Sequence, residues 1–581
     1  MRRTAAAVSL LLVLACSHAK AAPPVRRQDQ GFGRFVDEYF EGSFAFSPSS
    51  ATGAGFHHRD REMQDRSRAR IEARIAELKG HLAKVATFDR AALSFDDQLD
   101  ATLLENQIRS QLLDLDTLRT WETNPMSYAG GPGGAVYSLM SRDFGPRRDR
   151  LRSAVARMRG IPALYAAGKA NVKNPPKEFT ALAIRMSKGS VGFFEKTVAA
   201  WAKESAGEDA ALLAEFQEAN AKVVAAAKDF ADWLEKDLTP RSKGDYAIGA
   251  ERFLQKLKVD DMVEMPLEEL LARGEANLAR DYAAFVETAK KIDATKSPKD
   301  VMAMLEEEHP SAEQLLPSVR GSVEDARRFV VEHGIVTVPS EVRPRVEETP
   351  PFNRSGSFAS MSTPGAYETV ATEAYYYVTP VEPEWDAKHK EEHLRLYNRS
   401  VVAMINVHEV WPGHYLQFLY AKRFPTKTRK LYGCGTNSEG WAHYTEQMMV
   451  DEGFGGGDPK IRLAQLAEAL LRDCRYVVGI RLHTKGMTVE EGARLFEEKG
   501  FQQPANAYEE SRRGAYNPTY LYYTLGKLMI QDLRDEYRKK KGAAGSPATL
   551  RQFHDAFVKE GSIPIPLMRR VLFAEAAVPS R

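Results

Sequence analysis

The segment that decides how this chain folds and acts lies at residues 407–414, Val407-His408-Glu409-Val410-Trp411-Pro412-Gly413-His414. It is close to the zinc-peptidase pattern H-E-x-x-H, in which two histidines one helical turn apart face the same ion. Here the histidines are six positions apart, which on a regular helix turns them about 240° away from each other. An uninterrupted helix would therefore not bring His408 and His414 to one ion.

Pro412 and Gly413 indicate how this spacing is corrected. Proline cannot donate the helical hydrogen bond, and glycine accepts backbone angles that are closed to other residues. We predict a local bulge that takes these two residues out of the helical count and leaves His-Glu-Val-Trp-His. Gly413 should then hold backbone angles that a residue with a Cβ atom cannot adopt cheaply, and the two imidazoles should converge.

A second segment supplies further ligand types and reads Asn437-Ser438-Glu439-Gly440-Trp441-Ala442-His443-Tyr444-Thr445-Glu446. On a helix running to about residue 452, Glu439, His443 and Glu446 occupy positions i, i+4 and i+7 along one stripe. We predict that one Zn²⁺ ion is held by His408, His414 and Glu439. His443 and Glu446 would orient these ligands from behind. The alternative is that these residues cap helices and satisfy buried partners.

Other candidate site residues flank this pattern. Glu409 is the predicted general base, because it neighbours the ion without being a ligand. Tyr520 and Tyr523 are three positions apart, and either hydroxyl could donate to an oxyanion, although a tyrosine in a core helix is the alternative for each. Arg512 and Arg513 could hold a peptide carboxylate bidentately, and surface charges are the alternative for this pair.

Working outward, the chain divides near residue 345. Residues 32–345 show helical periodicity and no cluster of catalytic residue types, which indicates a helical scaffold. Residues 346–581 hold the metal-ligand pattern and 16 of the 22 tyrosines. Within them, residues 371–379 are β-formers closed by Pro380 and make the best strand candidate. We expect a mainly α protein in which both parts form one continuous fold.

The N-terminus is predicted to be a targeting signal. Arg2 and Arg3 precede a short apolar run and small residues, so residues 1–21 form a signal peptide. Either a lipobox places a lipid on Cys16, which we favour, or signal peptidase cuts after Ala19 or Ala21. Residues 22–31 would then be a tether. No other run is long enough to span a bilayer, so the mature chain should be exported and touch a membrane only through such an anchor.

Composition excludes several classes of protein. The 81 Lys and Arg residues nearly balance the 79 Asp and Glu residues, which argues against a nucleic-acid binder. Three cysteines are too few for a disulfide scaffold or a structural zinc finger. In the mature chain Cys434 and Cys474 would either pair or stay free.

At its motif the chain resembles the bacterial family known as domain of unknown function 885. The shared features are H-E-x-x-P-G-H at residues 408–414, Glu-Gly-Trp-Ala at 439–442, Pro-Gly-Ala-Tyr at 364–367 and Ala-Thr-Gly-Ala-Gly at 51–55. That family looks like a relative of helical zinc metallopeptidases of the thimet oligopeptidase and Taq carboxypeptidase types. The resemblance implies a helical bowl with a deep central channel and a small β edge sheet near the metal. It also implies that a peptide lies along residues 371–379, where Tyr376 would contact it.

Three functions fit these observations. The first is an exported zinc peptidase that hydrolyses short peptides, with Glu409 as general base. The second is an envelope lipoprotein that keeps the fold and binds peptides without cleaving them. The third is a metal-dependent hydrolase of a non-peptide amide or ester. The sequence leaves open the oligomeric state, the side-chain preference and the choice between exo- and endo-cleavage.

Overall fold

Helices form most of the chain that the computed structural model describes, which is residues 29–350, 354, 358–543 and 546–574. The first helices are α1 (Gln30–Phe46), α2 (Pro48–Ala54), α3 (Arg68–Val85), α4 (Phe95–Leu112), α5 (Thr120–Thr123), α6 (Met126–Met140), α7 (Arg147–Asn171), α8 (Lys177–Gly192), α9 (Ala199–Ala206), α10 (Ala210–Trp233), α11 (Thr239–Arg241), α12 (Ala250–Asp261), α13 (Leu267–Ile292), α14 (Pro298–Glu306) and α15 (Leu315–Glu332). π-Helical turns at Leu113–Thr117, Phe193–Val198 and Leu234–Leu238 follow α4, α8 and α10.

The remaining helices follow a small sheet. They are α16 (Ala387–Arg395), α17 (Arg399–Glu409), α18 (His414–Ala421), α19 (Lys427–Leu431), α20 (Gly435–Asp451), α21 (Pro459–Thr484), α22 (Val489–Gly500), α23 (Pro504–Tyr516), α24 (Tyr522–Lys541), α25 (Leu550–Val558) and α26 (Ile565–Phe573). The prediction of a mainly α fold with a small sheet is therefore confirmed.

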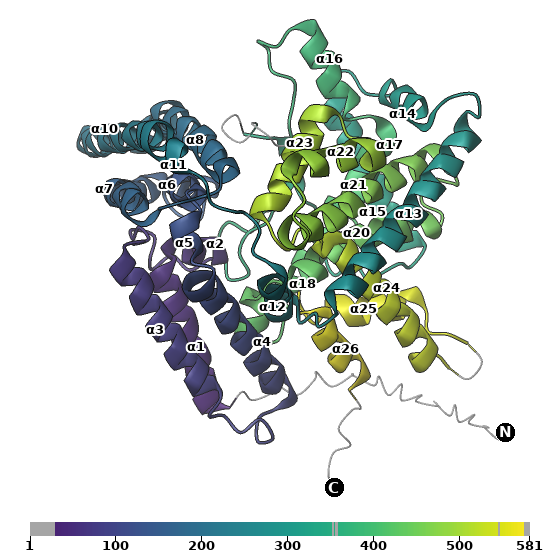
Figure 1. The fold of residues 1–581 in the computed structure, drawn as a ribbon, viewed down its shortest axis with the longest axis horizontal. Coiled ribbons are helices and arrows are strands. Elements are labelled where there is room, and N and C mark those ends of the chain that lie inside the picture. Colours follow the sequence, from purple (N-terminus) through teal and green to yellow (C-terminus); the bar gives the residue numbers. More distant parts are fainter. Residues whose placement is uncertain (1–28, 351–353, 355–357, 544–545, 575–581) are drawn as a thin grey trace, which may run out of the picture.

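The N-terminal helices lie to one side of the molecule (Figure 1). α1, α3 and α4 pack side by side and enclose an aromatic-rich core around Phe32, Phe35 and Phe40. α6, α7, α8 and α10 form a second layer next to them. α1 begins at Gln30 with Asp29 as its N-cap, so the end of the predicted tether 22–31 is already helical. The rest of that tether, the signal peptide 1–21 and Cys16 lie outside the described residues.

One hydrophobic core crosses the predicted boundary at residue 345. It joins buried side chains of α6, α7 and α10 to those of α13 and α21. A second core joins α15 to α17, α20 and the sheet. The two predicted parts of the chain therefore share their interior, and the last scaffold helices support the metal-ligand pattern directly.

The sheet has three short strands, β1 (Arg345–Glu348), β2 (Ala359–Ser362) and β3 (Tyr375–Val378), in the order β1-β3-β2. β3 runs parallel to β1 and antiparallel to β2, with Tyr376 opposite both Val346 and Met361. The strand predicted at 371–379 is thus present but shorter, and it is the central strand of the sheet. Since both of its edges are already paired, a peptide cannot add to it, and that part of the prediction is wrong.

Two further expectations can be compared with the structure. Cys434 and Cys474 are both buried and free, so of the two alternatives for these thiols the structure shows the unpaired one. In the part of the chain that is described, no helix is both long and apolar enough to cross a bilayer.

Candidate metal centre

The two histidines lie on either side of a break between helices. α17, capped by Asn398 at its start, ends at Glu409, and α18 begins at His414. Four residues, 410–413, separate the helices, so the break is longer than the two-residue bulge that we predicted. The Trp411–Pro412 peptide bond is cis. The indole N–H of Trp441, on α20, donates to the carbonyl of Pro412 at 2.8 Å and ties the break to the third ligand helix.

Gly413 has φ −75° and ψ −131°, and this ψ lies outside both the α and the β ranges of residues with a Cβ atom, in agreement with our prediction. The lack of a side chain is also required for space. The backbone N–H of Gly413 donates to the carbonyl of Val407 at 3.1 Å. A Cβ atom placed there would lie 1.7 Å from the carbonyl oxygen of His408. The chain can turn back this sharply only because no side chain is present.

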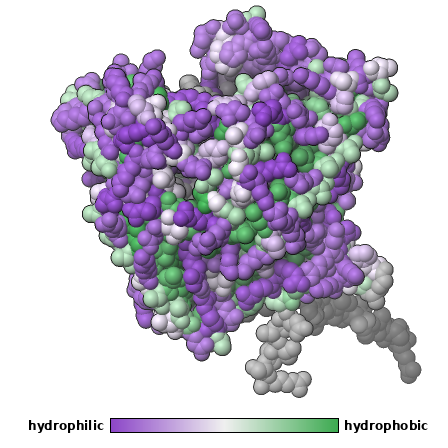
Figure 2. All heavy atoms as spheres, in the orientation of Figure 1, coloured by the Kyte–Doolittle hydropathy of each residue, from purple (hydrophilic) through white to green (hydrophobic). Residues whose placement is uncertain are grey.

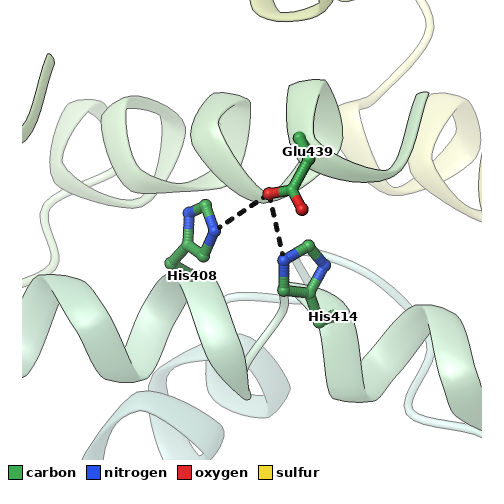
Figure 3. Close-up of side chains that lie close together, drawn as sticks. All are labelled: His408, His414 and Glu439. Atoms are coloured by element: carbon green, nitrogen blue, oxygen red, sulfur yellow. Dashed lines mark ion pairs between the residues drawn. The ribbon is translucent and has the colours of Figure 1, made fainter. Parts of the chain in front are cut away.

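The turn brings the three predicted ligands together (Figure 3). Both imidazoles point toward α20, where an oxygen of Glu439 lies 3.5 Å from Nε2 of His408 and 3.4 Å from Nε2 of His414. One ligand atom from each residue lies within 4.8 Å of the other two. Around a tetrahedral zinc ion, ligand atoms at ~2.0–2.1 Å are about 3.3–3.5 Å apart. The residue types and the two histidine–glutamate distances therefore fit such an ion, and the two histidine nitrogens lie within 4.8 Å of each other.

Buried charges support His408 from behind. Nδ1 of His408 lies 2.6 Å from Oε1 of Glu446, which is 1% exposed, so this nitrogen carries the proton and Nε2 faces Glu439. Burial disfavours the charged imidazole, but Glu439 and Glu446 outweigh burial and raise the pKa of His408 to about 9. The other oxygen of Glu446 lies 3.2 Å from Nδ1 of His443. This arrangement of carboxylate, histidine and open nitrogen is typical of metal ligands.

The charge of Glu446 is balanced by an arginine that the sequence analysis missed. Arg472 on α21 lies 3.4 Å from Glu446 and also pairs with Glu468 at 2.6 Å. Burial lowers the pKa of His443 to about 3, so that imidazole is neutral. The only signal in the sequence was the pair Arg472 and Arg475, which are two of several charged residues in α21. Spacing alone could not connect that pair to residue 446.

Glu409 faces the sheet. One of its oxygens accepts a hydrogen bond from the backbone N–H of Met361, on β2, at 3.2 Å. This contact holds the carboxylate beside the ligand group without making it a ligand. Tyr376, predicted to contact a peptide, is 1% exposed and lies in the core beneath Glu409. The prediction for Tyr376 is wrong because the central strand turns that ring inward.

The two candidate tyrosines have different surroundings. Tyr520 is fully buried, and its hydroxyl donates to Glu510. The ring of Tyr523 lies 6.5 Å from that of His408. Its hydroxyl makes no hydrogen bond within the described part of the chain. Burial, and then the charge of Glu439, raise the pKa of Tyr523, so it remains a proton donor. Of the two, only Tyr523 has a hydroxyl available to a ligand at the metal centre.

The two candidate arginines also differ. Arg512 pairs with Glu509 on its own helix, α23. Arg513 stacks over Tyr520, with its guanidinium carbon 5.0 Å from the ring centre, and has no acidic partner among the described residues. On the same helix, Glu510 belongs to a largely buried pair that we did not predict, in which it accepts two hydrogen bonds from Arg475 at 2.7 and 2.9 Å.

Fold and ligand set define a mainly helical protein with a two-histidine, one-glutamate candidate metal centre. The chain belongs to the family described as bacterial protein of unknown function (DUF885), whose model matches residues 48–572. Two solved structures are similar. A candidate lipoprotein of unknown function from Shewanella oneidensis is 28% identical, with a TM-score of 0.79 over 94% of this chain and 100% of the other. A candidate lipoprotein from Colwellia psychrerythraea is 19% identical, with a TM-score of 0.79 over 94% and 98%, and shows the same fold. No curated protein matches this chain.

Proposed function

We propose that this chain is an exported zinc-dependent peptidase that hydrolyses short peptides. The observation that carries the proposal is the convergence of His408, His414 and Glu439 next to a carboxylate that is not a ligand, Glu409. Hydrolysis at such a site needs three ligands, a base and an open position. When bound, zinc supplies Lewis acidity toward carbonyl and water oxygens.

Glu409 has the position of a general base. The N–H of Met361 fixes one carboxylate oxygen, and the other has no hydrogen-bond partner among the described residues. That oxygen would take a proton from the attacking water and pass it to the leaving amine. The protonated hydroxyl of Tyr523, which has no hydrogen-bond partner among the described residues, would donate to the oxyanion that forms on the scissile carbonyl.

The peptide would lie along β2 instead of β3. Phe358 accepts a hydrogen bond from Thr379, so residues 358, 360 and 362 face β3. The N–H of Met361 points to Glu409, so the backbone groups of Ala359 and Met361 face away from β3. A substrate strand could pair with the C=O groups of both residues and with the N–H of Ala359. This pairing would place its amide bonds beside Glu409.

Export to the envelope belongs to the proposal. It is supported by the charged and apolar start of the sequence and by the two similar proteins described as candidate lipoproteins. We propose that contact with a membrane is through the lipid anchor alone, that nucleic acid is not a partner, and that a deep channel admits only short peptides.

Purified mature chain, loaded with zinc, should hydrolyse members of a mixed peptide library, as followed by mass spectrometry. Glu409→Gln should keep one zinc per chain and lose turnover, because the change removes a base and no ligand. Zinc binding without cleavage of any peptide would favour the peptide-binding lipoprotein. Cleavage of esters or non-peptide amides alone would favour the third function.

A further inference from the structure

Next to the candidate metal centre is a group of side chains whose charges do not balance. It consists of Arg475 on α21, Glu510 and Arg513 on α23, and Tyr520 and Tyr523 beyond the end of α23. Arg475 lies over both tyrosine rings, 5.0 Å from the centre of Tyr520 and 5.1 Å from that of Tyr523. The group therefore contains two guanidinium groups, those of Arg475 and Arg513, and one carboxylate, that of Glu510.

Both oxygens of the Glu510 carboxylate already accept hydrogen bonds from neighbouring side chains. Both oxygens of Glu510 accept hydrogen bonds from Arg475, and the hydroxyl of Tyr520 donates to one of them. The contact with Arg475 is bidentate, which is the strongest geometry for this pair. Arg513 acts on Glu510 only through its charge and forms no ion pair with it. The cluster keeps a net charge of one positive unit, located on Arg513.

The neighbouring residue, Arg512, does have an acidic partner, so the lack of one is particular to Arg513. Arg512 pairs with Glu509, and so does Arg185 from α8 across the space between the two parts of the molecule. Figure 2 shows the surface indented between these parts. Arg513 is half-buried against Tyr520 and has no such acid in the described residues. A guanidinium that is partly removed from water gains most when an anion binds to it.

The position of Arg513 indicates which anion would bind. Tyr523 connects the cluster to the metal centre, since its ring lies 6.5 Å from that of His408 and 5.1 Å from the guanidinium carbon of Arg475. An anion on Arg513 would therefore belong to the molecule whose reacting bond lies at the metal centre. Short peptides carry one planar carboxylate that does not depend on their side chains, the C-terminal one.

We propose that Arg513 binds the free C-terminal carboxylate of the substrate, so that a short fragment is released from the C-terminus of a peptide. This inference rests on the proposed peptidase function. The feature that carries it is the guanidinium of Arg513, which has no acidic partner among the described residues, lies over Tyr520 and is linked through Arg475 and Tyr523 to His408. Arg513 is a binding residue in this proposal, and Glu409 and the metal ligands keep their roles.

The test compares three forms of one N-acetylated neutral pentapeptide on zinc-loaded, full-length mature chain. They are the free acid, the C-terminal amide, and an amide whose last residue is glutamate. We expect the amide to have a KM about 10- to 100-fold higher than the free acid, as for loss of a charge-assisted hydrogen-bonded pair. The glutamate amide should behave like the plain amide. Equal KM values for acid and amide, or rescue by the glutamate side chain, would overturn the proposal.

Arg513→Gln should remove the difference between acid and amide by raising the KM of the acid, and Arg513→Lys should restore part of it. Arg512→Gln is the matched control, because that side chain already has a partner, and it should keep the full difference. Zinc content and circular dichroism should be unchanged in all three variants. An Arg513→Gln protein that still prefers the acid would also overturn the proposal.

Binding separates this proposal from the peptidase function. Calorimetry with zinc-loaded Glu409→Gln should show tighter binding of the acid than of the amide, and Arg513→Gln added to it should abolish the difference. If no peptide is hydrolysed but this pattern holds, the carboxylate site stands and the peptidase function fails. If peptides are hydrolysed with no preference for the acid, the carboxylate site fails and the function stands.

Discussion

The two regions that supply metal ligands are built in opposite ways. α17 and α18 deliver His408 and His414 across a break, whereas α20 delivers Glu439, His443 and Glu446 from a single uninterrupted helix. Each region depends on a glycine at a position where the surrounding atoms leave no room for a Cβ atom. At Gly413 the obstacle is the neighbouring turn of the same segment, and at Gly440 it is another helix.

The two glycines are therefore constrained differently: Gly413 by its own segment, and Gly440 by packing against a helix distant in sequence. A Cβ on Gly440 would lie 2.6 Å from the Cα of Gly526, where α20 and α24 cross closely. The atoms nearest to a Cβ on Gly413 would be those of the carbonyl groups of residues 407 and 408. We therefore expect damage at Gly440 to spread through the core, and damage at Gly413 to stay in the metal centre.

Gly440→Ala should have the largest effect on the whole protein. The obstacle is backbone, which cannot rotate away, so α20 and α24 must separate. We expect the free energy of unfolding to fall by about 1–3 kcal/mol, the usual cost of overpacking. Chemical denaturation followed by circular dichroism measures this. Gly80→Ala, in helix α3 with open space around it, is the control and should be neutral or stabilising. Equal stability of the two variants would contradict tertiary control of α20.

Gly413→Ala should lose zinc while the fold remains. One methyl group is enough to push the turn away from His408, and a ligand displaced by about 1 Å no longer bonds well. We expect loss of stoichiometric zinc, measured by atomic emission, with the helical circular dichroism of the wild type. Gly433→Ala, where nothing lies within 4 Å, should keep the metal. Wild-type zinc affinity in Gly413→Ala would show that the break does not position His414.

Glu446→Gln tests the support that α20 provides to α17. The change removes the negative charge that holds the Nδ1 proton of His408 and leaves Arg472 with only Glu468 nearby. Loss of such an outer partner typically weakens zinc binding by about 10- to 100-fold. Competition with a chelator measures the affinity. Glu452→Gln, at the exposed end of the same helix, is the control and should bind zinc normally.

Trp441→Phe should have the smallest effect. It removes the hydrogen bond from α20 to the carbonyl of Pro412, which costs about 1 kcal/mol of stability and loosens the break. Trp411→Phe is a matched control, because the buried indole N–H of Trp411 has no partner among the described residues. Thermal unfolding with and without zinc compares the variants. If Trp411→Phe lost more of the zinc-dependent stabilisation than Trp441→Phe, the tie between α20 and the break would be refuted.

The residue types of the site follow from the sequence alone. The donors His408, His414 and Glu439 were identified from their motif, and the stripe of Glu439, His443 and Glu446 from helical periodicity. The stripe follows because neighbours on a helix are set by a spacing of three and four residues. The grouping of His408, His414 and Glu439 follows from the motif, and the structure brings these three side chains close together. The mainly helical class follows from the same periodicity, and the strand near residue 375 follows from its β-forming residues.

Only the tertiary structure decided how these pieces meet. It made β3 the central strand and buried Tyr376. Within the described residues, the hydroxyl of Tyr520 is hydrogen-bonded and that of Tyr523 is not, and Arg512 has an acidic partner whereas Arg513 has none. The break at Gly413 is held by Trp441, and Glu409 is held by the backbone of Met361. These contacts join residues distant in sequence. They depend on how helices and strands pack, and the spacing of residues along the chain carries no information about that packing.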